Sequence, residues 1–159
     1  MARRVRTGMA VVATALILAG AADAATSTSM TPPESSLLAA MNEARLLHGL
    51  KPLRCDARLE RAARRHSSKM LRTGTFFHGA FSARIRRVGV RAPRVGENLA
   101  WSQGSLEQAR AIVGQWLASP PHRANLLRPG YRLVGVGALR GRFGGYRNTL
   151  LVTTDFAGR

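Results

Sequence analysis

Three residues in this sequence, His78, Glu97 and His122, are of types that often bind metals or transfer protons in proteins. They lie in the segments "FFHGAF", "VGENLAW" and "SPPHRANLL", where glycine or proline predicts a turn or a helix end. Two histidines and a carboxylate can bind zinc or another divalent metal with one position open, or act as general acid and base without a metal. No two of them are three or four residues apart, so only the fold can bring them together.

Ser119 begins the segment "SPPHRANLL" and adds a second interpretation. A set of Ser119, His122 and Glu97 contains the residue types of a hydrolase that uses a serine nucleophile. However, a serine followed by proline is also a common helix start, where the hydroxyl accepts hydrogen bonds from backbone N–H groups. We therefore expect Ser119 to cap a short helical turn. The alternative for the whole set is a buried polar network that locks the chain.

Apolar periodicity predicts the helices that must position these residues. The first runs from about Glu34 to His48, and Gly49 follows it. Its expected apolar stripe is Leu37, Leu38, Met41 and Leu47. The second helix is capped by Asp56 and ends near Gly74. Its expected apolar side is Leu59, Ala62, Ala63, His66 and Met70, where a histidine is more often a hydrogen-bonded core residue than a ligand.

Shorter segments follow the second helix. A basic helix is expected from about Ser82 to Val88, and "RAPRVGENLAW" is expected to be extended because proline disrupts a helix interior. A third long helix opens at Ser105, which forms a capping box with Gln108, and continues through Trp116. Trp101 and Trp116 are expected in the core.

Two strand-like segments close the chain, Tyr131 to Leu139 and Asn148 to Phe156. The glycine-rich "RGRFGGYR" joins them, so they are predicted to form an antiparallel hairpin. Gly135 and Gly137 indicate close backbone packing within the first of these strands. Because helices come early and strands late, the pattern predicts an α+β layered domain.

The N-terminus is typical of an export signal. Three arginines precede an apolar run from Met9 to Gly20, and a small-residue cleavage site ends at Ala24. The apolar run is shorter than the roughly 20 residues of a membrane span. We therefore expect a signal peptide at 1–24, a flexible leader at 25–35, a domain at 36–159 and a secreted, extracellular protein. The single cysteine, Cys55, excludes a disulfide within the chain and is expected to be half-buried and unreactive.

The charge is strongly positive, with 25 Lys and Arg against 8 Asp and Glu and a formal net charge of +17. Such a chain is expected to attract polyanions outside the cell, such as wall polymers or anionic lipids. A solvated arginine-rich surface without a specific partner is the alternative. Four arginines recur at helical spacing on the expected outer face of the second helix, namely Arg58, Arg61, Arg65 and Arg72. No aromatic residues alternate with them, which argues against a specific nucleic-acid surface.

The order of the motifs resembles that of the CAP superfamily, also called SCP-like domains. The resemblance spans about Ser36 to Gly158 and rests on "LLAAMNEARLLHGLKPLRCDARLERAARRHSSKM", "FFHGAFSARIRRVGV", "VGENLAW", "QWLASPPHRANLL", "YRLVGVGAL" and "TTDFAG". That family groups cysteine-rich secretory, antigen 5 and pathogenesis-related proteins with exported bacterial proteins. It implies a three-layer α-β-α sandwich with a small antiparallel sheet and a central cleft lined by histidine and glutamate.

By motif, the resemblance makes His78 the first cleft histidine and Glu97 the cleft glutamate. The chain departs from the family at two positions: the second expected glutamate is Ser119, and the histidine expected near Leu151 is absent. His122 lies one helical turn after Ser119 and is expected to reach the same cleft.

The resemblance implies a secreted binding or interaction module whose cleft binds a divalent metal such as zinc through His78, His122 and Glu97. Its basic surface would meet anionic wall polymers or lipids. The alternative is a secreted metal-dependent or histidine-assisted hydrolase that acts on peptide or cell-wall material.

Overall fold

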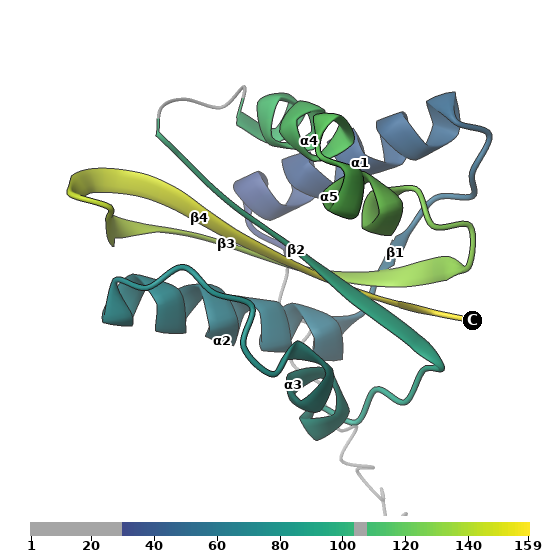
Figure 1. Cartoon of the computed structure of the whole chain (residues 1–159), viewed down its shortest axis with the longest axis horizontal. Helices are drawn as coiled ribbons and strands as arrows, with labels where there is room; N and C mark the ends of the chain where they lie inside the picture. The colour runs from purple at the N-terminus through teal and green to yellow at the C-terminus, as the bar shows by residue number, and fades with distance from the viewer. Residues whose placement is uncertain (1–29, 104–107) are drawn as a thin grey trace, which may run out of the picture.

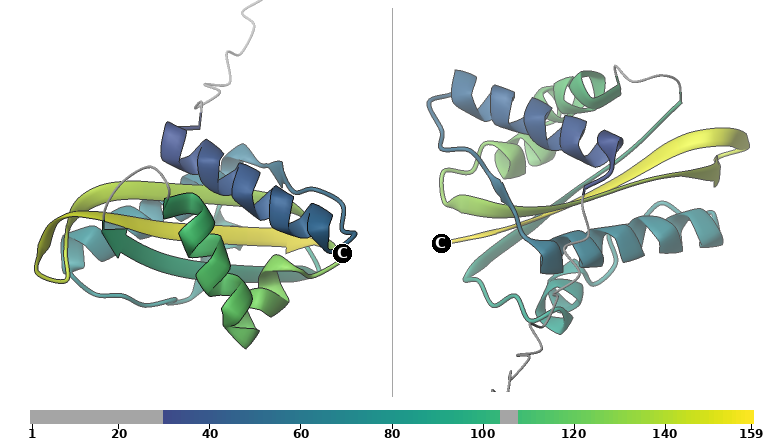
Figure 2. Two further views of the ribbon diagram at one scale, coloured as in Figure 1. Left: turned by 90° about the horizontal axis from the view of Figure 1, so that it is seen from above. Right: turned by 180° about the vertical axis from the view of Figure 1, so that it is seen from behind.

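The computed structural model describes residues 30–103 and 108–159, which form three layers (Figure 1). Helices α1 (Pro32–Leu47), α4 (Gln108–Ala118) and α5 (Pro120–Leu126) cover one face of a sheet. Helices α2 (Ala57–Thr73) and α3 (Phe81–Arg87) cover the other face. The same layering is seen from behind in Figure 2. The α-β-α sandwich of an α+β domain is therefore confirmed.

The sheet contains β1 (Arg54–Cys55), β2 (Arg94–Gln103), β3 (Tyr131–Phe143) and β4 (Tyr146–Gly158), in the order β1-β3-β4-β2. The β3–β4 and β2–β4 pairs are antiparallel, whereas β1 pairs with β3 in parallel. The sheet is thus mixed rather than purely antiparallel. Strand β1 was not predicted, because two residues are too few to show an alternating pattern.

The predicted β3–β4 hairpin is confirmed, and both strands are longer than expected. The strands continue into the glycine-rich link and leave only a tight turn at Gly144 and Gly145. These two glycines have φ angles of +59° and +85°, a left-handed conformation that other residues rarely adopt. Glycine is therefore required at the turn rather than along the whole link.

Helix α2 packs directly on β3, and it begins and ends where the sequence predicts. The Asp56 carboxylate accepts hydrogen bonds from the backbone N–H groups of Arg58 and Leu59. At Gly135 an added Cβ would lie 2.0 Å from the carbonyl carbon of Leu59, so only glycine allows this approach. The expected apolar side of α2 is buried, which fixes the arginine stripe on the outer face.

Helix α1 begins at Pro32, inside the segment 25–35 that was predicted to be a leader. The Glu34 carboxylate accepts a hydrogen bond from the Thr31 N–H at 2.8 Å and pairs with Arg64 of α2. These bonds attach the start of the helix to the domain. The prediction that Leu47 belongs to the apolar stripe is wrong, because it is 81% exposed where the chain turns away.

Most predictions about buried residues are confirmed. His66 is 4% exposed, and its Nε2 lies 2.7 Å from the carbonyl oxygen of Phe77. Burial, together with the Arg84 charge, lowers the pKa of His66 to about 4, so it is neutral in the core. Trp116 is buried and donates its Nε1–H to the Leu99 carbonyl. Trp101, in contrast, is 40% exposed, so its predicted core position is wrong.

Cys55 is exposed rather than half-buried as expected. Its thiol lies 3.3 Å from Glu60 Oε2. Partial desolvation of the sulfur and the neighbouring carboxylates raise the pKa of Cys55 to about 12. The thiol therefore stays protonated near neutral pH, in agreement with an unreactive cysteine.

Within residues 30–103 and 108–159, no helix is both long enough and apolar enough to cross a membrane. The predicted signal peptide and the Ser105 end of the capping box lie outside the described residues.

Candidate functional site

Glu97 occupies the middle of β2, and its buried side chain faces two charged partners. It lies opposite Asp155 in the β2–β4 register. Arg84 of α3 forms ion pairs with both carboxyl groups, with its Nη2 3.2 Å from Asp155 Oδ1. Glu97, Asp155 and Arg84 therefore form one buried charge cluster beneath the cleft.

Two carboxyl groups share one cation in this cluster. Burial raises the pKa of Glu97 to about 9; the Arg84 charge opposes this rise and the Asp155 charge adds to it. Burial also raises the pKa of Asp155. Because the cluster cannot hold two negative charges against one positive charge without cost, a proton is retained by the carboxyl pair near neutral pH.

His78 follows the exposed end of α2 and lies directly over Glu97. Its Nδ1 is 2.7 Å from Glu97 Oε1, and its side chain is 54% exposed. Partial burial and the nearby His122 and Arg84 charges lower the pKa of His78. The imidazole is therefore neutral near pH 7. Among the described residues its Nε2 has no hydrogen-bond partner.

Ser119 is the N-cap residue of α5, but its hydroxyl makes no capping hydrogen bond. Instead Ser119 Oγ lies 2.9 Å from His122 Nδ1, so the prediction that the hydroxyl faces backbone amides is wrong. Pro120 and Pro121 occupy the first two helical positions and lack N–H groups, which removes one of the two usual capping donors. The serine is thus available to the histidine one turn later.

The predicted residues come together as two pairs, His78 with Glu97 and His122 with Ser119. The His122 charge also contributes, after burial, to the lowered pKa of His78. Partial burial also lowers the pKa of His122. Within the described residues His122 has no hydrogen bond to a carboxylate, so the Ser119, His122 and Glu97 set is not assembled as a hydrolytic triad.

Two asparagines hold β2 against α5 behind these pairs. Asn98 donates its side-chain N–H to the His122 carbonyl at 3.0 Å, and Asn125 donates to the Glu97 carbonyl at 3.0 Å. Both side chains therefore join β2 to α5 through hydrogen bonds to backbone carbonyl groups. They fix the backbone that carries Glu97 and His122.

An open hollow of about 300 Å³ lies beside His122. Its lining includes Ser119, Trp116 and two exposed aromatic residues, Phe76 and Trp101. Trp101 also stacks on Tyr146, with ring centroids 6.4 Å apart. The cleft thus combines polar imidazole and hydroxyl groups with an aromatic wall, a composition that suits a bound organic ligand.

The sequence matches the family model described as CAP, the cysteine-rich secretory protein family, over residues 38–156. This chain belongs to the CAP family. It is 32% identical over 114 residues to the uncharacterized protein YkwD of Bacillus subtilis (strain 168), which is 69% of this chain and 43% of YkwD. It is 32% identical over 115 residues to the uncharacterized membrane protein YlbC of the same organism, 69% of this chain and 32% of YlbC. The chain therefore spans less than half the length of these curated relatives.

Solved structures of CAP proteins show the same fold. An extracellular protein containing an SCP domain from Bacillus anthracis str. Ames superposes with a TM-score of 0.65 at 26% identity, covering 84% of this chain and 45% of that chain. An outer surface protein from Borrelia burgdorferi gives a TM-score of 0.69 at 23% identity, covering 82% and 96% respectively. The second comparison shows the fold alone.

The three-residue metal centre predicted for this CAP cleft does not fit the described geometry. Among residues 30–103 and 108–159, no group of three His, Cys, Asp or Glu side chains is placed to hold a metal ion. One oxygen of Glu97 faces His78 and the other faces Arg84. The Nδ1 atoms of His78 and His122 face Glu97 and Ser119, and the Nε2 atom of neither ring has a hydrogen bond among the described residues.

Sequence reasoning missed two members of the CAP site, Arg84 and Asp155. Asp155 is the one acidic residue in the apolar strand segment "LLVTTDFAG", and a charged residue there requires a partner when buried. Arg84 belongs to a basic helix whose two other arginines, Arg86 and Arg87, are exposed, so its sequence context does not distinguish it.

Proposed function

We propose that this CAP chain is an exported binding module whose cleft accepts a divalent metal ion, zinc being the first candidate. Its positively charged surface would meet anionic cell-envelope polymers or lipids. The predicted signal peptide supports export. So does the relative whose name describes an extracellular protein.

The orientation of the two histidines carries the metal proposal. Each Nδ1 faces a protein group, Glu97 behind His78 and Ser119 behind His122, so both Nε2 atoms are left for a ligand. A carboxylate behind a histidine is the usual outer partner of a metal ligand, because it fixes the ring and raises its basicity. The lowered pKa values of His78 and His122 keep both rings neutral, as metal binding requires.

A site with two protein ligands is expected to bind zinc more weakly than a structural centre, which has four. The remaining positions would be open to solvent or to a ligand in the aromatic hollow. When bound, the metal would supply a Lewis acid to an oxygen of that ligand. Because Glu97 must lose its proton to act as the partner of a metal-bound histidine, zinc binding should release a proton.

Titration calorimetry of zinc into the chelator-stripped protein tests the proposal. Saturable binding to one site should be lost in both His78→Ala and His122→Ala. His48→Ala is the matched control and should leave zinc binding unchanged. This exposed histidine lies at the end of α1, outside the cleft pair of His78 and His122. Binding that persists in both cleft variants would refute the metal proposal.

A second candidate function is a hydrolase that acts on peptide or cell-wall material. The observation in its favour is the 2.9 Å contact between Ser119 Oγ and His122 Nδ1, which brings a hydroxyl within hydrogen-bond reach of a base. A fluorophosphonate probe should then label the protein, and Ser119→Ala and His122→Ala should each abolish labelling. Cys55→Ala should leave it unchanged. Absence of labelling in the unaltered protein would remove this candidate.

A further inference from the structure

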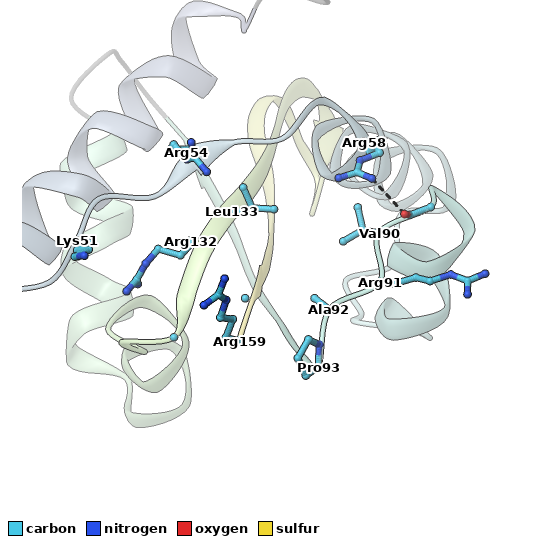
Figure 3. A pocket seen from close by; sticks show the side chains of 13 residues that line it. Lys51, Arg54, Arg58, Val90, Arg91, Ala92, Pro93, Arg132, Leu133 and Arg159 are labelled. Atoms are coloured by element: carbon cyan, nitrogen blue, oxygen red, sulfur yellow. Dashed lines mark hydrogen bonds between the residues drawn. The ribbon is translucent and has the colours of Figure 1, made fainter.

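A second hollow, much larger than the cleft, lies elsewhere on the domain. Its volume is about 790 Å³, and none of its lining residues is shared with the hollow beside His122. It is bordered by β1, the first turn of α2, the segment 89–93 and the ends of β3 and β4 (Figure 3). We call it the basic groove, because its charged lining residues are Lys51, Arg54, Arg58, Arg91, Arg132 and Arg159.

The positive charges border the basic groove on two sides. In Figure 3, Lys51, Arg54 and Arg132 lie on one side of β3, whereas Arg58 and the segment 89–93 lie on the other. Arg91 extends away from the groove in the same view. No acidic residue lines the groove, and within the described residues only Asp56 neutralises one of its cations, through an ion pair with Arg58 at 2.8 Å.

The groove combines free and anchored cations. Among residues 30–103 and 108–159, the exposed side chains of Lys51 and Arg54 have no hydrogen bond or ion pair. Arg132 is anchored, since its Nη1 donates to the Tyr131 carbonyl at 2.8 Å, and Arg58 is held by Asp56 and the Gly89 carbonyl. Anchored guanidinium groups lose less entropy on binding a ligand. Gathered, unpaired like charges in a hollow focus a positive potential on an incoming anion.

The chemistry of the lining favours phosphate. Arginine presents a planar fork of N–H donors that matches phosphate and carboxylate oxygens. Donors on two sides of a hollow suit the tetrahedral phosphate better than the planar carboxylate, because phosphate oxygens point in several directions. No aromatic side chain lines the groove, so it offers no platform for the bases of single-stranded nucleic acid. Its concave form and its volume suit a chain segment rather than the flat surface of a membrane.

We propose that the basic groove binds a segment of a linear phosphate-bearing polymer, with Lys51, Arg54, Arg58 and Arg132 contacting successive phosphates. This inference deepens the proposed function, on which it rests for the anionic partner outside the cell. It is independent of the metal cleft, since the two sites share no residue.

Fluorescence anisotropy with end-labelled inorganic polyphosphate tests the groove, with purified protein and two double variants of equal charge. Lys51→Gln/Arg54→Gln changes two groove cations that have no partner in the described structure and should weaken binding about tenfold or more. It should also lower the slope of log K against log salt by about two, one for each lost phosphate contact. Arg61→Gln/Arg65→Gln, on the exposed face of α2, is the control and should leave the slope unchanged.

Other results would overturn the proposal. Equal loss of affinity in both double variants would mean that net charge alone attracts polyphosphate. Equal or tighter groove-dependent binding of polyglutamate, single-stranded DNA or phosphatidylglycerol vesicles would assign the groove to a carboxylate polymer, a nucleic acid or a membrane. His78→Ala separates the two proposals: it should abolish zinc binding and leave polyphosphate binding intact. Zinc binding without groove-dependent polyphosphate binding would refute this inference alone.

Discussion

Arginine has opposite environments in the cleft and in the basic groove. In the cleft, Arg84 is 16% exposed and lies between the buried carboxyl groups of Glu97 and Asp155. In the groove, Arg54 is exposed and has no partner in the described part of the chain. Arg58 is paired with one carboxylate, that of Asp56, and also donates to the Gly89 carbonyl. The two regions thus differ in how completely each cation is neutralised by the protein.

The difference indicates what each region is built to do. A buried charge must be paired, because removing it from water costs several kcal/mol, so Arg84 is already committed to the fold. An exposed cation in a groove stays solvated and costs little, so it is available to an external anion. The cleft therefore offers a ligand its neutral imidazole groups, and the groove offers its charge.

Arg84→Met should have the largest effect, because it leaves two buried carboxyl groups without their cation. We expect the free energy of unfolding to fall by about 3–5 kcal/mol near neutral pH, the usual cost of breaking a buried ion pair. The loss should shrink as the pH is lowered and both carboxyl groups become protonated. Urea unfolding followed by circular dichroism measures both effects.

Arg86→Met in the same helix is the matched control, since Arg86 is exposed and has no partner among the described residues. A surface change of this kind should alter stability by no more than about 0.5 kcal/mol. If Arg84→Met were as mild as the control, the buried cluster would not hold the cleft together, and the contrast with the groove would fail.

Glu97→Gln should have a smaller effect that depends on pH. The pKa of Glu97 is raised from 4.5 to about 9, so the folded protein keeps a proton that the unfolded chain has lost within this range. The contribution of Glu97 to the free energy of unfolding is therefore fully present below about pH 4.5 and is lost as the pH rises toward about 9. The slope can reach about 1.4 kcal/mol per pH unit for one proton.

The glutamine variant has no proton to lose at this position. Its stability relative to the unaltered protein should therefore rise with pH above about 4.5 and level off above about 9. Glu43→Gln, at an exposed position of α1, should show no such trend. A difference between Glu97→Gln and the unaltered protein that is constant with pH would contradict the shared-proton interpretation of the cleft.

The elements of this fold were predictable where local chemistry decides them. Asp56 as a helix cap, Gly144 and Gly145 as a turn and His66 as a core residue each follow from neighbouring sequence and are observed. The cleft was predictable in part, since His78 contacts Glu97 and His122 contacts Ser119.

The rest of the site depends on contacts between distant segments. Asp155 meets Glu97 through strand register, and Arg84 reaches both from a separate helix, so neither pairing is visible in local patterns. Ser119 had two local options, the backbone or His122, and the prolines after it decide between them. Trp101 is exposed because it follows the buried stretch of β2, and its ring packs with Tyr146 of the hairpin.

Lys51→Gln/Arg54→Gln should have the smallest effect on stability, and its sign should differ from that of Arg84→Met. Removing two unpaired cations from a crowded groove relieves like-charge repulsion, so the free energy of unfolding should stay equal or rise slightly, by no more than about 0.5 kcal/mol. Any gain should disappear at high salt, because in 1 M salt the interaction between exposed charges is screened beyond a distance of about 3 Å. Urea unfolding at low and high salt measures it. A clear loss of stability would show that Lys51 and Arg54 support the fold. Like Arg84, they would then be occupied within the protein rather than available to a ligand.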